Sequence, residues 1–462
     1  MKKFGKVVAT AMSATMLAGM LAGCGGATEA KYEYVPTMSN DGKVLNVYAW
    51  NTEFIERFTA YYPGYEAANA DDVTAGGKIG DVTVKFTIVP SDDNAYQDNL
   101  DQHLAKQADA DADDKIDLFL VEADYALKYV DNNNTLAMAD LGVDTMGDQY
   151  QYTKDVVTDR YGNVKGSSWQ GCPGALIYSA EIAEAVLGTS DPAEVQAYVK
   201  DWTTFQSTAA TVAESGYLMT ATANDTYRVF SNNVTSKWVV DGKINVDENI
   251  KTWVEMSKAM VDAGQTGTDD LWSPAWSAGF AADGNVFCYF GPAWLIDFCM
   301  NAHSEDDADY GTSRADNGDW RVTAGPQGFY WGGTWVCAAN GTDNADLVGD
   351  IIKTMTTNDD VLAKIIEEKN DFVNDSALIQ KYSTDANFGS KILGGQNPLP
   401  IFADKLSSVD LSNITGYDQG CNEEFQKAMK GYFDGNYATY DDALKAFYQA
   451  VTTKYPAVKA PK

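Results

Sequence analysis

The sequence predicts an α/β protein built from two domains, and its length, composition and periodicity lead to that prediction. The 462 residues exceed the roughly 100–200 that one domain usually holds. Hydrophobic residues make up 45% and charged residues 22%, as in ordinary globular chains, so each half can bury a core. Segments with strand periodicity alternate with segments with helix periodicity, which indicates sheets covered by helices.

Strands and helices are predicted to alternate in the first part of the chain. Alternating apolar positions indicate strands at 44–50 and 82–89. Residues 116–121 are apolar apart from Asp117, as expected of a strand buried on both faces of a parallel sheet. Helical periodicity follows each strand, at 54–62, 96–108 and 125–130. We therefore expect each domain to contain a mostly parallel sheet flanked by helices.

A second α/β unit is predicted from about residue 172 onward. A strand at 175–178 precedes a helix at 180–187, and another strand is expected at 286–290. Asp191 and Pro192 predict the start of a further helix, because Asp caps helix N-termini and Pro fits the first turn. The remaining predicted helices are 195–213, 250–263, 347–356, 361–368, 423–432 and 440–453.

The first 24 residues have the layout of an export signal. Three lysines precede an apolar stretch at 7–20, which is too short and too polar to span a bilayer permanently. The following Leu-Ala-Gly-Cys, which ends at Cys24, resembles the lipobox of bacterial lipoproteins. This resemblance implies a signal peptide at 1–23, acylation of Cys24 and attachment to a membrane. The alternative is a plain secretory signal with an incidental cysteine. Residues 24–42 show little periodicity and are expected to form a tether.

Charge and cysteine usage narrow the functional classes. The formal net charge of −32 repels nucleic acid and anionic lipid, so we expect no nucleic-acid partner and a neutral or cationic ligand. Only two histidines occur, and no Cys-x-x-Cys pair, so we expect neither a metal nor a cofactor. Five cysteines follow Cys24, an odd number that leaves at least one thiol unpaired.

An acidic run at 109–117 partly matches a calcium-binding loop. Its aspartates have the spacing of the first three ligand positions. However, Asp114 occupies the position that requires glycine, and Leu120 the position that requires glutamate. A solvated acidic loop is the favoured interpretation.

Several fragments, in order, resemble the carbohydrate-type extracellular solute-binding proteins of ATP-driven importers, a family typified by maltose-binding proteins. They are residues 45–51, 116–120 with Tyr125 and Tyr129, 169–179, 278–294 and 331–335. The resemblance covers nearly the whole mature chain. It departs from the family at 279–283, where Gly-Phe-Ala-Ala-Asp replaces the usual small-Lys-Ala-Ala-Met element.

This resemblance implies two hinge-connected lobes of the periplasmic-binding-protein type. The implied first lobe is 43–170 with 333–385, and the implied second lobe is 171–332 with 386–462. The family's members bind a carbohydrate between the lobes without converting it and deliver it to the permease of an ABC transporter. A monomer is expected. A secreted glycoside hydrolase with a carboxylate pair and a lectin without a transporter are the alternatives. Peptides, polyamines and polyols stay open as ligands.

A sugar site needs aromatic faces beside hydrogen-bonding side chains. Eight of the 11 tryptophans lie between 238 and 335, so the second lobe is expected to supply the aromatic wall. Ligands in open α/β sheets bind outside the carboxyl ends of strands. These arguments and the resemblance select the expected ligand-binding residues, which are Trp50, Asn51, Glu122, Asp124, Trp169, Trp272, Trp276, Phe290, Trp294, Trp331, Trp335, Tyr417 and Asp418. Any of these aromatic residues can instead be core, and the carboxylates can be solvated loop residues.

Overall fold

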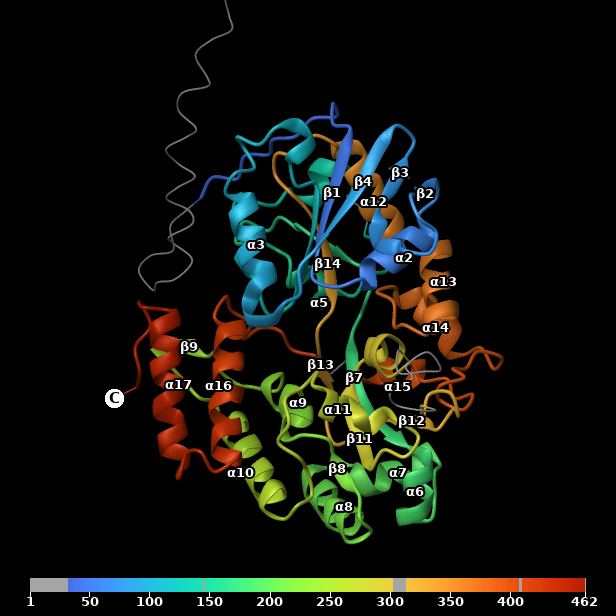
Figure 1. The fold of residues 1–462 in the computed structure, drawn as a ribbon, viewed down its shortest axis with the longest axis vertical. Helices are drawn as coiled ribbons and strands as arrows, with labels where there is room; N and C mark the ends of the chain where they lie inside the picture. The colour runs from blue at the N-terminus through green and yellow to red at the C-terminus, as the bar shows by residue number, and fades with distance from the viewer. Residues whose placement is uncertain (1–31, 144–145, 302–312, 407–408, 462) are drawn as a thin grey trace, which may run out of the picture.

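The computed structural model describes residues 32–143, 146–301, 313–406 and 409–461. Two lobes lie one above the other along the long axis of the molecule (Figure 1). We define the first lobe by its seven-stranded sheet and the second by its five-stranded sheet. The predicted two-lobe α/β fold is confirmed. Cys24 and the predicted signal peptide, residues 1–23, lie outside the described residues.

The sheet of the first lobe has the strand order β2-β3-β4-β1-β5-β14-β6. Its strands are β1 Val44–Ala49, β2 Tyr65–Ala67, β3 Gly77–Ile79, β4 Val82–Ile88, β5 Leu118–Glu122, β6 Ser167–Ser168 and β14 Thr334–Ala338. Strand β1 pairs in parallel with β4 and β5, whereas β14 runs antiparallel to both β5 and β6. The hairpin strands β2 and β3 add two further antiparallel pairings at the opposite edge.

The sheet of the second lobe has the order β12-β7-β11-β8, with β13 also pairing with β7. Its strands are β7 Pro173–Ser179, β8 Leu218–Thr220, β11 Val286–Gly291, β12 Trp320–Thr323 and β13 Phe329–Tyr330. Among these pairings β8 with β11 is parallel, and β7 is antiparallel to β11, β12 and β13.

The prediction of mostly parallel sheets is therefore wrong for both lobes. Periodicity identifies a strand but carries no information on its direction. The direction of β14 follows from its connection: the chain enters this strand from the second lobe, at the carboxyl ends of β1 and β5, and so runs opposite to them.

Helices cover both sheets (Figure 1). The first lobe has α2 Glu53–Tyr61, α3 Ala95–Leu104, α4 Ala126–Val130, α5 Gln151–Asp155, α12 Ala345–Thr357, α13 Asp359–Lys369 and α14 Ser376–Ser383. The second has α6 Ala180–Leu187, α7 Pro192–Val199, α8 Trp202–Glu214, α9 Tyr227–Ser231, α10 Glu248–Asp262, α11 Pro274–Ser277, α15 Leu399–Lys405, α16 Asp418–Phe433 and α17 Tyr440–Lys454.

Helix caps explain where the predicted helices begin and where one of them divides. The Asp191 carboxylate accepts hydrogen bonds from the backbone N–H groups of residues 193 and 194, so the predicted cap of α7 is confirmed. The segment 195–213, which the sequence predicts to be largely helical, is helical over most of its length. It divides into α7 and α8 because Asp201 caps a new helix by accepting from Thr204 N at 2.7 Å.

Strand β5 shows how the first sheet is buried on both faces. Leu118 and Leu120 pack in the core under α2, α12 and α13, while Phe119 and Val121 pack on the other side with α3 and α4. All four side chains are fully buried, as predicted. Asp117 is also buried rather than solvated, because its carboxylate accepts from Asn46 N at 2.8 Å and from a threonine hydroxyl.

The chain passes from the first sheet to the second between β6 and β7, at residues 169–172, and returns between β13 and β14, at residues 331–333. Residues 171 and 372 lie side by side, with Gly171 N donating to Phe372 O at 2.9 Å. The second passage turns through Gly332 and Gly333, whose φ angles are 73° and 93°. These angles lie in the left-handed region that favours glycine.

A buried cluster of charges joins the lobes beside these passages. The guanidinium of Arg57 on α2 lies 3.4 Å from Glu53, 3.3 Å from Asp371 and 3.6 Å from Asp297, which follows β11 of the second lobe. The Gln170 amide donates to Glu53 and Asp371 as well. Burial raises the pKa of Glu53 to about 7 and that of Asp297 to about 6, against the opposing charge of Arg57.

The expectation that all of residues 24–42 form a tether is wrong for residues 32–42. These residues lie along the first lobe at its end remote from the second lobe (Figure 1). Backbone hydrogen bonds join Ser39 N to Thr342 O at 2.9 Å and Gly42 N to Asp343 O at 2.8 Å. Low apolar periodicity failed to reveal this docking because hydrogen bonds and tyrosine rings make the contacts.

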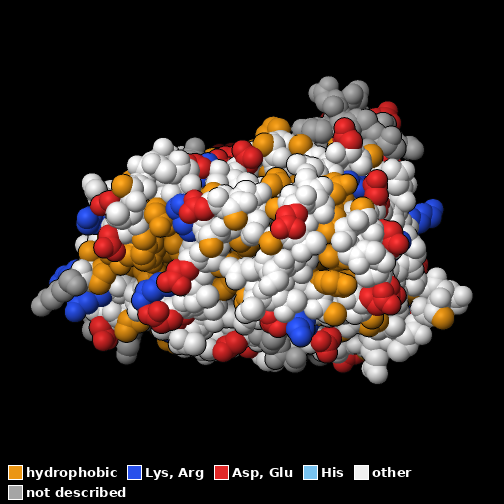
Figure 2. All heavy atoms as spheres, turned by 90° about the horizontal axis from the view of Figure 1, so that it is seen from below, with side chains coloured by type: hydrophobic (Ala, Val, Ile, Leu, Met, Phe, Trp, Pro, Cys, Tyr) orange, Lys and Arg blue, Asp and Glu red, His pale blue; other side chains and the backbone are white. Residues whose placement is uncertain are grey.

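The described residues can be compared with the sequence expectations on cysteines, membrane-spanning helices and surface charge. Among the described cysteines, Cys172, Cys288, Cys337 and Cys421 are free thiols. Within the four described ranges, no helix is both long and apolar enough to cross a bilayer. Figure 2 shows acidic side chains dispersed over the underside of the second lobe, in keeping with the strongly negative charge.

Candidate functional site

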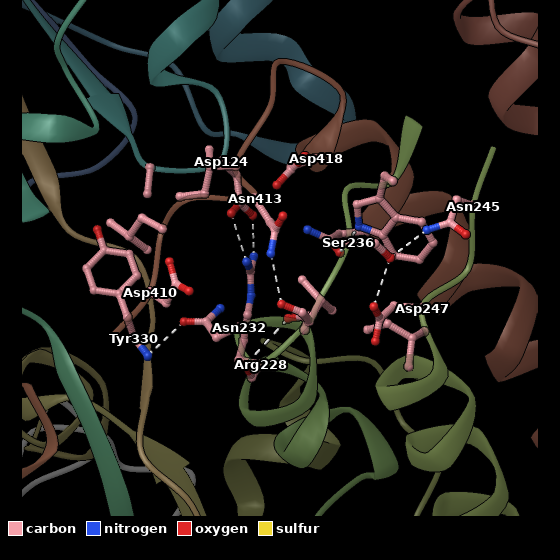
Figure 3. Close-up of a pocket in the computed structure, with 18 of the residues that line it drawn as sticks. Asp124, Arg228, Asn232, Ser236, Asn245, Asp247, Tyr330, Asp410, Asn413 and Asp418 are labelled. Atoms are coloured by element: carbon pink, nitrogen blue, oxygen red, sulfur yellow. Dashed lines mark hydrogen bonds and ion pairs between the residues drawn. The ribbon is translucent and has the colours of Figure 1, made fainter. Parts of the chain in front are cut away.

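A polar pocket lies between the two lobes (Figure 3). Ala123 and Asp124, at the carboxyl end of β5, form its first-lobe wall. The other lining residues come from the second lobe and its passage to the first, and they are Arg228, Ser231, Asn232, Val234, Ser236, Trp238, Asn245, Asp247, Ile250, Tyr330, Gly332, Asp410, Leu411, Asn413, Ile414, Asp418 and Asn422. The pocket therefore obeys the rule that ligands bind beyond the carboxyl ends of parallel strands.

An ion pair crosses the pocket from one lobe to the other. Arg228 Nη1 and Nη2 on α9 donate to Asp124 Oδ1 and Oδ2 at 2.9 and 2.5 Å. The two side chains are 19% and 18% exposed, so water screens the pair only partly. Burial opposes the charge of Arg228, but Asp124 and Glu122 outweigh it and raise the pKa of the guanidinium. The pair holds the lobes together on this side.

Two further carboxyl groups face the same arginine. Burial and the neighbouring Asp124 raise the pKa of Glu122 to about 8, with Arg228 opposing the shift. Burial raises the pKa of Asp418 to about 7, although a hydrogen bond from Thr415 opposes it. Near pH 7 these groups therefore carry protons part of the time and can both donate and accept hydrogen bonds.

The second-lobe wall is a preformed polar network. Asn245 donates to Ser236 Oγ at 2.7 Å, and Ser236 donates to Asp247 at 2.9 Å. The Trp238 indole donates to Asn422 Oδ1 at 3.0 Å. Because these side chains hold one another in place, they present hydroxyl, amide and carboxylate groups to a ligand with little ordering cost.

A segment of the second lobe, residues 409–414, contributes four residues to the pocket lining. Asn413 Nδ2 donates to Val234 O at 3.0 Å, while Leu411 and Ile414 pack on the first-lobe core that contains Tyr96 and Tyr125. A further bond between the lobes runs from Gln419 Nε2 to Asn94 Oδ1 at 2.9 Å. The lobes are thus in contact along the α16 side.

Four tryptophans, 272, 276, 294 and 331, form a cluster next to this pocket. Trp294 stacks with Trp272 at 6.2 Å between ring centroids and meets Trp331 edge-on at 5.2 Å. The Trp294 indole donates to Trp331 O at 3.2 Å. A Cβ atom on the pocket residue Gly332 would lie 3.2 Å from the Trp294 ring, so the cluster borders the pocket at Gly332.

Trp272 is the solvent-facing member of the tryptophan cluster. Its side chain is 55% exposed, whereas Trp276 is 2% exposed. Its φ of 69° is a strained backbone conformation for a bulky residue. Strain of this kind is concentrated at functional sites, and an exposed aromatic face is what a sugar ring requires.

The structure distributes the predicted site residues among three environments. Asp124 and Asp418 line the pocket, and Glu122 lies beside them. Trp272, Trp294 and Trp331 lie in the adjoining cluster, whose fourth member, Trp276, is buried. The remaining predicted residues are Trp276, Trp169, Phe290 and Trp335, which are buried in cores, and Trp50, Asn51 and Tyr417, which are half-buried outside the pocket lining.

The contacts of these remaining residues account for them without a ligand. The Trp335 indole donates to Thr153 O at 2.7 Å, and Trp169 packs on Phe54 at 5.5 Å. Trp50 meets Tyr96 edge-on at 5.6 Å. We therefore leave the seven residues of this third group outside the candidate site.

Sequence reasoning missed most of the second-lobe wall, above all Arg228, Asn245, Asp247 and Asn413. The strand-end rule did not select them because they lie on α9, on the turn before α10 and on the segment 409–414. One feature of the sequence could have identified Arg228. Arginine is rare in this acidic chain, and its side chain keeps its positive charge at all physiological pH values.

Across the described residues, no group of three or more His, Cys, Asp or Glu side chains is arranged to hold a metal ion. The carboxylates of the pocket are instead engaged by Arg228 and by hydroxyl and amide groups. The arrangement suits binding through hydrogen bonds and aromatic contacts.

The fold and pocket define a two-lobe solute-binding protein. The sequence model of the family described as bacterial extracellular solute-binding protein matches residues 65–372, more than half of the chain, and the chain belongs to this family. The family comprises extracytoplasmic carriers that bind solutes without converting them. No curated protein matches the sequence.

Solved structures share the fold at low sequence identity. An ABC transporter-associated binding protein from Bifidobacterium animalis subsp. lactis, in complex with β-1,6-galactobiose, is 18% identical with a TM-score of 0.69, over 91% of this chain and 100% of that chain. The galacto-N-biose/lacto-N-biose I-binding protein of Bifidobacterium longum is 14% identical with a TM-score of 0.64, over 91% and 100%. The GacH receptor of Streptomyces glaucescens is 15% identical with a TM-score of 0.62, over 90% and 100%.

Proposed function

We propose that this protein is a lipid-anchored carrier that captures a carbohydrate, in particular an oligosaccharide, between its lobes and delivers it to the permease of an ABC transporter. The observation that carries the proposal is the inter-lobe pocket, whose polar side chains from both lobes adjoin a tryptophan cluster. Relatives in fold include proteins solved with β-1,6-galactobiose and lacto-N-biose.

The chemistry of the pocket suits an uncharged sugar. Hydroxyl groups pair with acceptors and donors such as Asp247, Asn245 and Arg228, while the C–H face of a ring stacks on Trp272. A ligand that contacts both Asp124 and Arg228 stabilises the closed form by its differential affinity for that form. No bond needs to be made or broken.

The domain division stays part of the proposal. Residues 43–170 with 333–385 form one lobe, and 171–332 with 386–462 form the other. Two contacts support it: β14 pairs with β5 in the first sheet, and α15 packs against β7 in the second.

A tryptophan fluorescence titration against neutral oligosaccharides, amino acids and polyamines tests the proposal. We expect saturable quenching or a spectral shift with one neutral oligosaccharide, which chromatography then recovers intact. Cleavage of the sugar would favour a glycoside hydrolase, and binding of polyamines alone would remove the carbohydrate assignment. Deletion of the gene should abolish uptake of that sugar, whereas unaffected uptake would favour a lectin.

Acylation of Cys24 is tested separately. Cells grown with a radiolabelled fatty acid should label the wild-type protein, and Cys24→Ser should be unlabelled and released from the membrane. A labelled Cys24→Ser variant would contradict the anchor.

A further inference from the structure

The N-terminal segment, residues 32–42, docks on a specific set of side chains of the first lobe. We call this segment the N-terminal strap. Lys165 is fully buried under two strap tyrosines, with its ammonium 5.0 Å from the ring centroid of Tyr32 and 4.4 Å from that of Tyr34. The same ammonium lies 3.2 Å from Asp159, which accepts from the Tyr32 hydroxyl at 2.7 Å.

The charged groups beneath the strap are paired with each other. Burial lowers the pKa of Lys165, and the charge of Asp159 opposes that shift. Burial alone would raise the pKa of Asp159, but hydrogen bonds from Asn163 and Tyr32 and the charge of Lys165 outweigh it and lower the pKa to about 2. A cation between two aromatic faces and a carboxylate is a specific, desolvated contact.

The rest of the strap is held by hydrogen bonds along its length. Val35 N donates to Asn133 Oδ1 at 2.9 Å, and Thr37 N donates to Asn340 Oδ1 at 2.7 Å. Ser39 N and Gly42 N donate to backbone carbonyls after β14. The strap is therefore fixed at both ends and in the middle.

The position of the strap relative to the pocket follows from strand direction. The pocket lies at the carboxyl end of β5, where Asp124 begins its first-lobe wall. The strap forms hydrogen bonds with residues 340–343, which follow β14. Strand β14 runs antiparallel to β5. The strap therefore lies at one end of the strands of the first sheet, and the pocket lies at the other end (Figure 1).

We propose that the N-terminal strap fixes the point where the membrane anchor leaves the protein, at the pole of the first lobe remote from the pocket. This inference rests on the proposed acylation of Cys24. The eight residue steps from Cys24 to Tyr32 reach at most about 28 Å, whereas the 19 steps to Lys43 reach about 66 Å. A globule of this size has a radius of gyration of about 22 Å, so the docked strap holds the first lobe near the membrane and the second lobe away from it.

The experiment compares lipidated full-length protein and a strap variant, Tyr32→Ala with Tyr34→Ala, on phosphatidylcholine vesicles that carry an acceptor-labelled lipid. A donor dye is placed at Ala185→Cys, an exposed site on α6 of the second lobe, in a Cys299→Ala background. We expect low energy transfer for the wild type and at least a twofold increase for the strap variant. Tyr198→Ala, which removes an exposed tyrosine on α7, is the matched control and should behave as the wild type.

Hydrogen exchange reports strap docking independently of the anchor. The amides of residues 35, 37, 39 and 42 should be protected in the wild type and exchange at least tenfold faster in the strap variant. Failure of the lipidated preparation to float with vesicles would overturn the anchor while exchange still measures docking. Flotation with equal energy transfer in both proteins, or unprotected strap amides in the wild type, would overturn the strap inference.

Discussion

Arg228 on α9 and Asp124 after β5 belong to opposite lobes, and two parallel hydrogen bonds of 2.9 and 2.5 Å join them. A bidentate pair of this kind is stronger and more directional than a single-point ion pair. It joins two surfaces that must separate for a ligand to enter and meet again when the ligand is held. Among the contacts between the lobes, this one can be tested by a single substitution.

Asp124→Asn should weaken ligand affinity by about tenfold, equivalent to about 1.4 kcal/mol, because the closed form loses its charge-assisted bonds. Calorimetric titration gives the affinity, and small-angle scattering gives the open fraction without ligand. Asp101→Asn is the matched control, since Asp101 pairs with Lys128 at 2.7 Å within the first lobe. Equal affinity in wild type and Asp124→Asn would show that this pair does not hold the closed form.

Two neighbouring tryptophans should respond in opposite ways. Trp272→Ala removes an exposed ring and should weaken sugar binding at least tenfold with little change in melting temperature. Trp276→Ala should instead cost about 3–5 kcal/mol of folding stability, because that ring is buried and its indole donates to Asp225 Oδ1 at 2.8 Å. Thermal unfolding with titration separates these effects, and undiminished affinity in Trp272→Ala would exclude that ring from the site.

Trp294→Ala should also weaken binding, since this ring supports Trp272 and borders the pocket at Gly332. We expect a smaller loss of affinity than in Trp272→Ala, because Trp294 acts partly by holding the Trp272 ring in place. An unaltered affinity in fluorescence titration would remove Trp294 from the account.

Closure should strengthen as the pH falls from 8 to 5. In the closed form the pKa of Glu122 is about 8 and that of Asp418 about 7, whereas solvated carboxyl groups in an open form titrate near 4. The closed form then binds more protons in this window, so its stability is full below about pH 4 and declines as the pH rises through 7 to 8. Small-angle scattering across this range measures the closed fraction.

Glu122→Gln isolates the pocket contribution to this pH dependence. The junction groups Glu53 and Asp297 also have raised pKa values, of about 7 and about 6, and they shift stability in the same direction. The variant should reduce the slope of the profile from about pH 4 to about pH 8, and between pH 7 and 8 it should leave the profile nearly flat. An identical profile in wild type and variant would assign the effect to other groups.

The passage at residues 331–333 should be intolerant of side chains. A Cβ on Gly333 would lie 3.1 Å from the Tyr330 hydroxyl and 3.3 Å from Cys172 Sγ, in addition to the strain of its φ of 93°. Gly333→Ala should therefore lower stability by about 2 kcal/mol or more. Gly188→Ala, with a φ of 74° and open space around it, measures the backbone strain alone and should cost about 1 kcal/mol. Equal melting temperatures for the two variants would contradict the steric argument.

The sequence predicted the elements of this fold better than their arrangement. The caps at Asp191 and the buried run of β5 are local patterns, so they could be identified directly. The direction of β14 depends on which lobe the chain arrives from, and the docking of Tyr32 depends on Lys165, more than 100 residues away. Neither relationship has a local signature.

The candidate site was predictable where it follows the strand-end rule and not elsewhere. Asp124 ends the segment after β5 and was identified on that basis. Phe290 and Trp335 were also selected because they lie at or beside strand ends, yet every residue of β11 and β14 is buried, so their side chains lie in cores. Arg228 and Asn413 come from a short helix and an irregular segment, whose convergence on Asp124 arises only from tertiary packing.

A crystal structure of the protein with the oligosaccharide that binds most tightly tests the central claim most directly. We expect an intact sugar between the lobes, with its hydroxyl groups on Asp124 and Arg228 and one ring face on Trp272. A sugar bound away from both lobes, or the absence of binding by any neutral oligosaccharide at millimolar concentration, would contradict it.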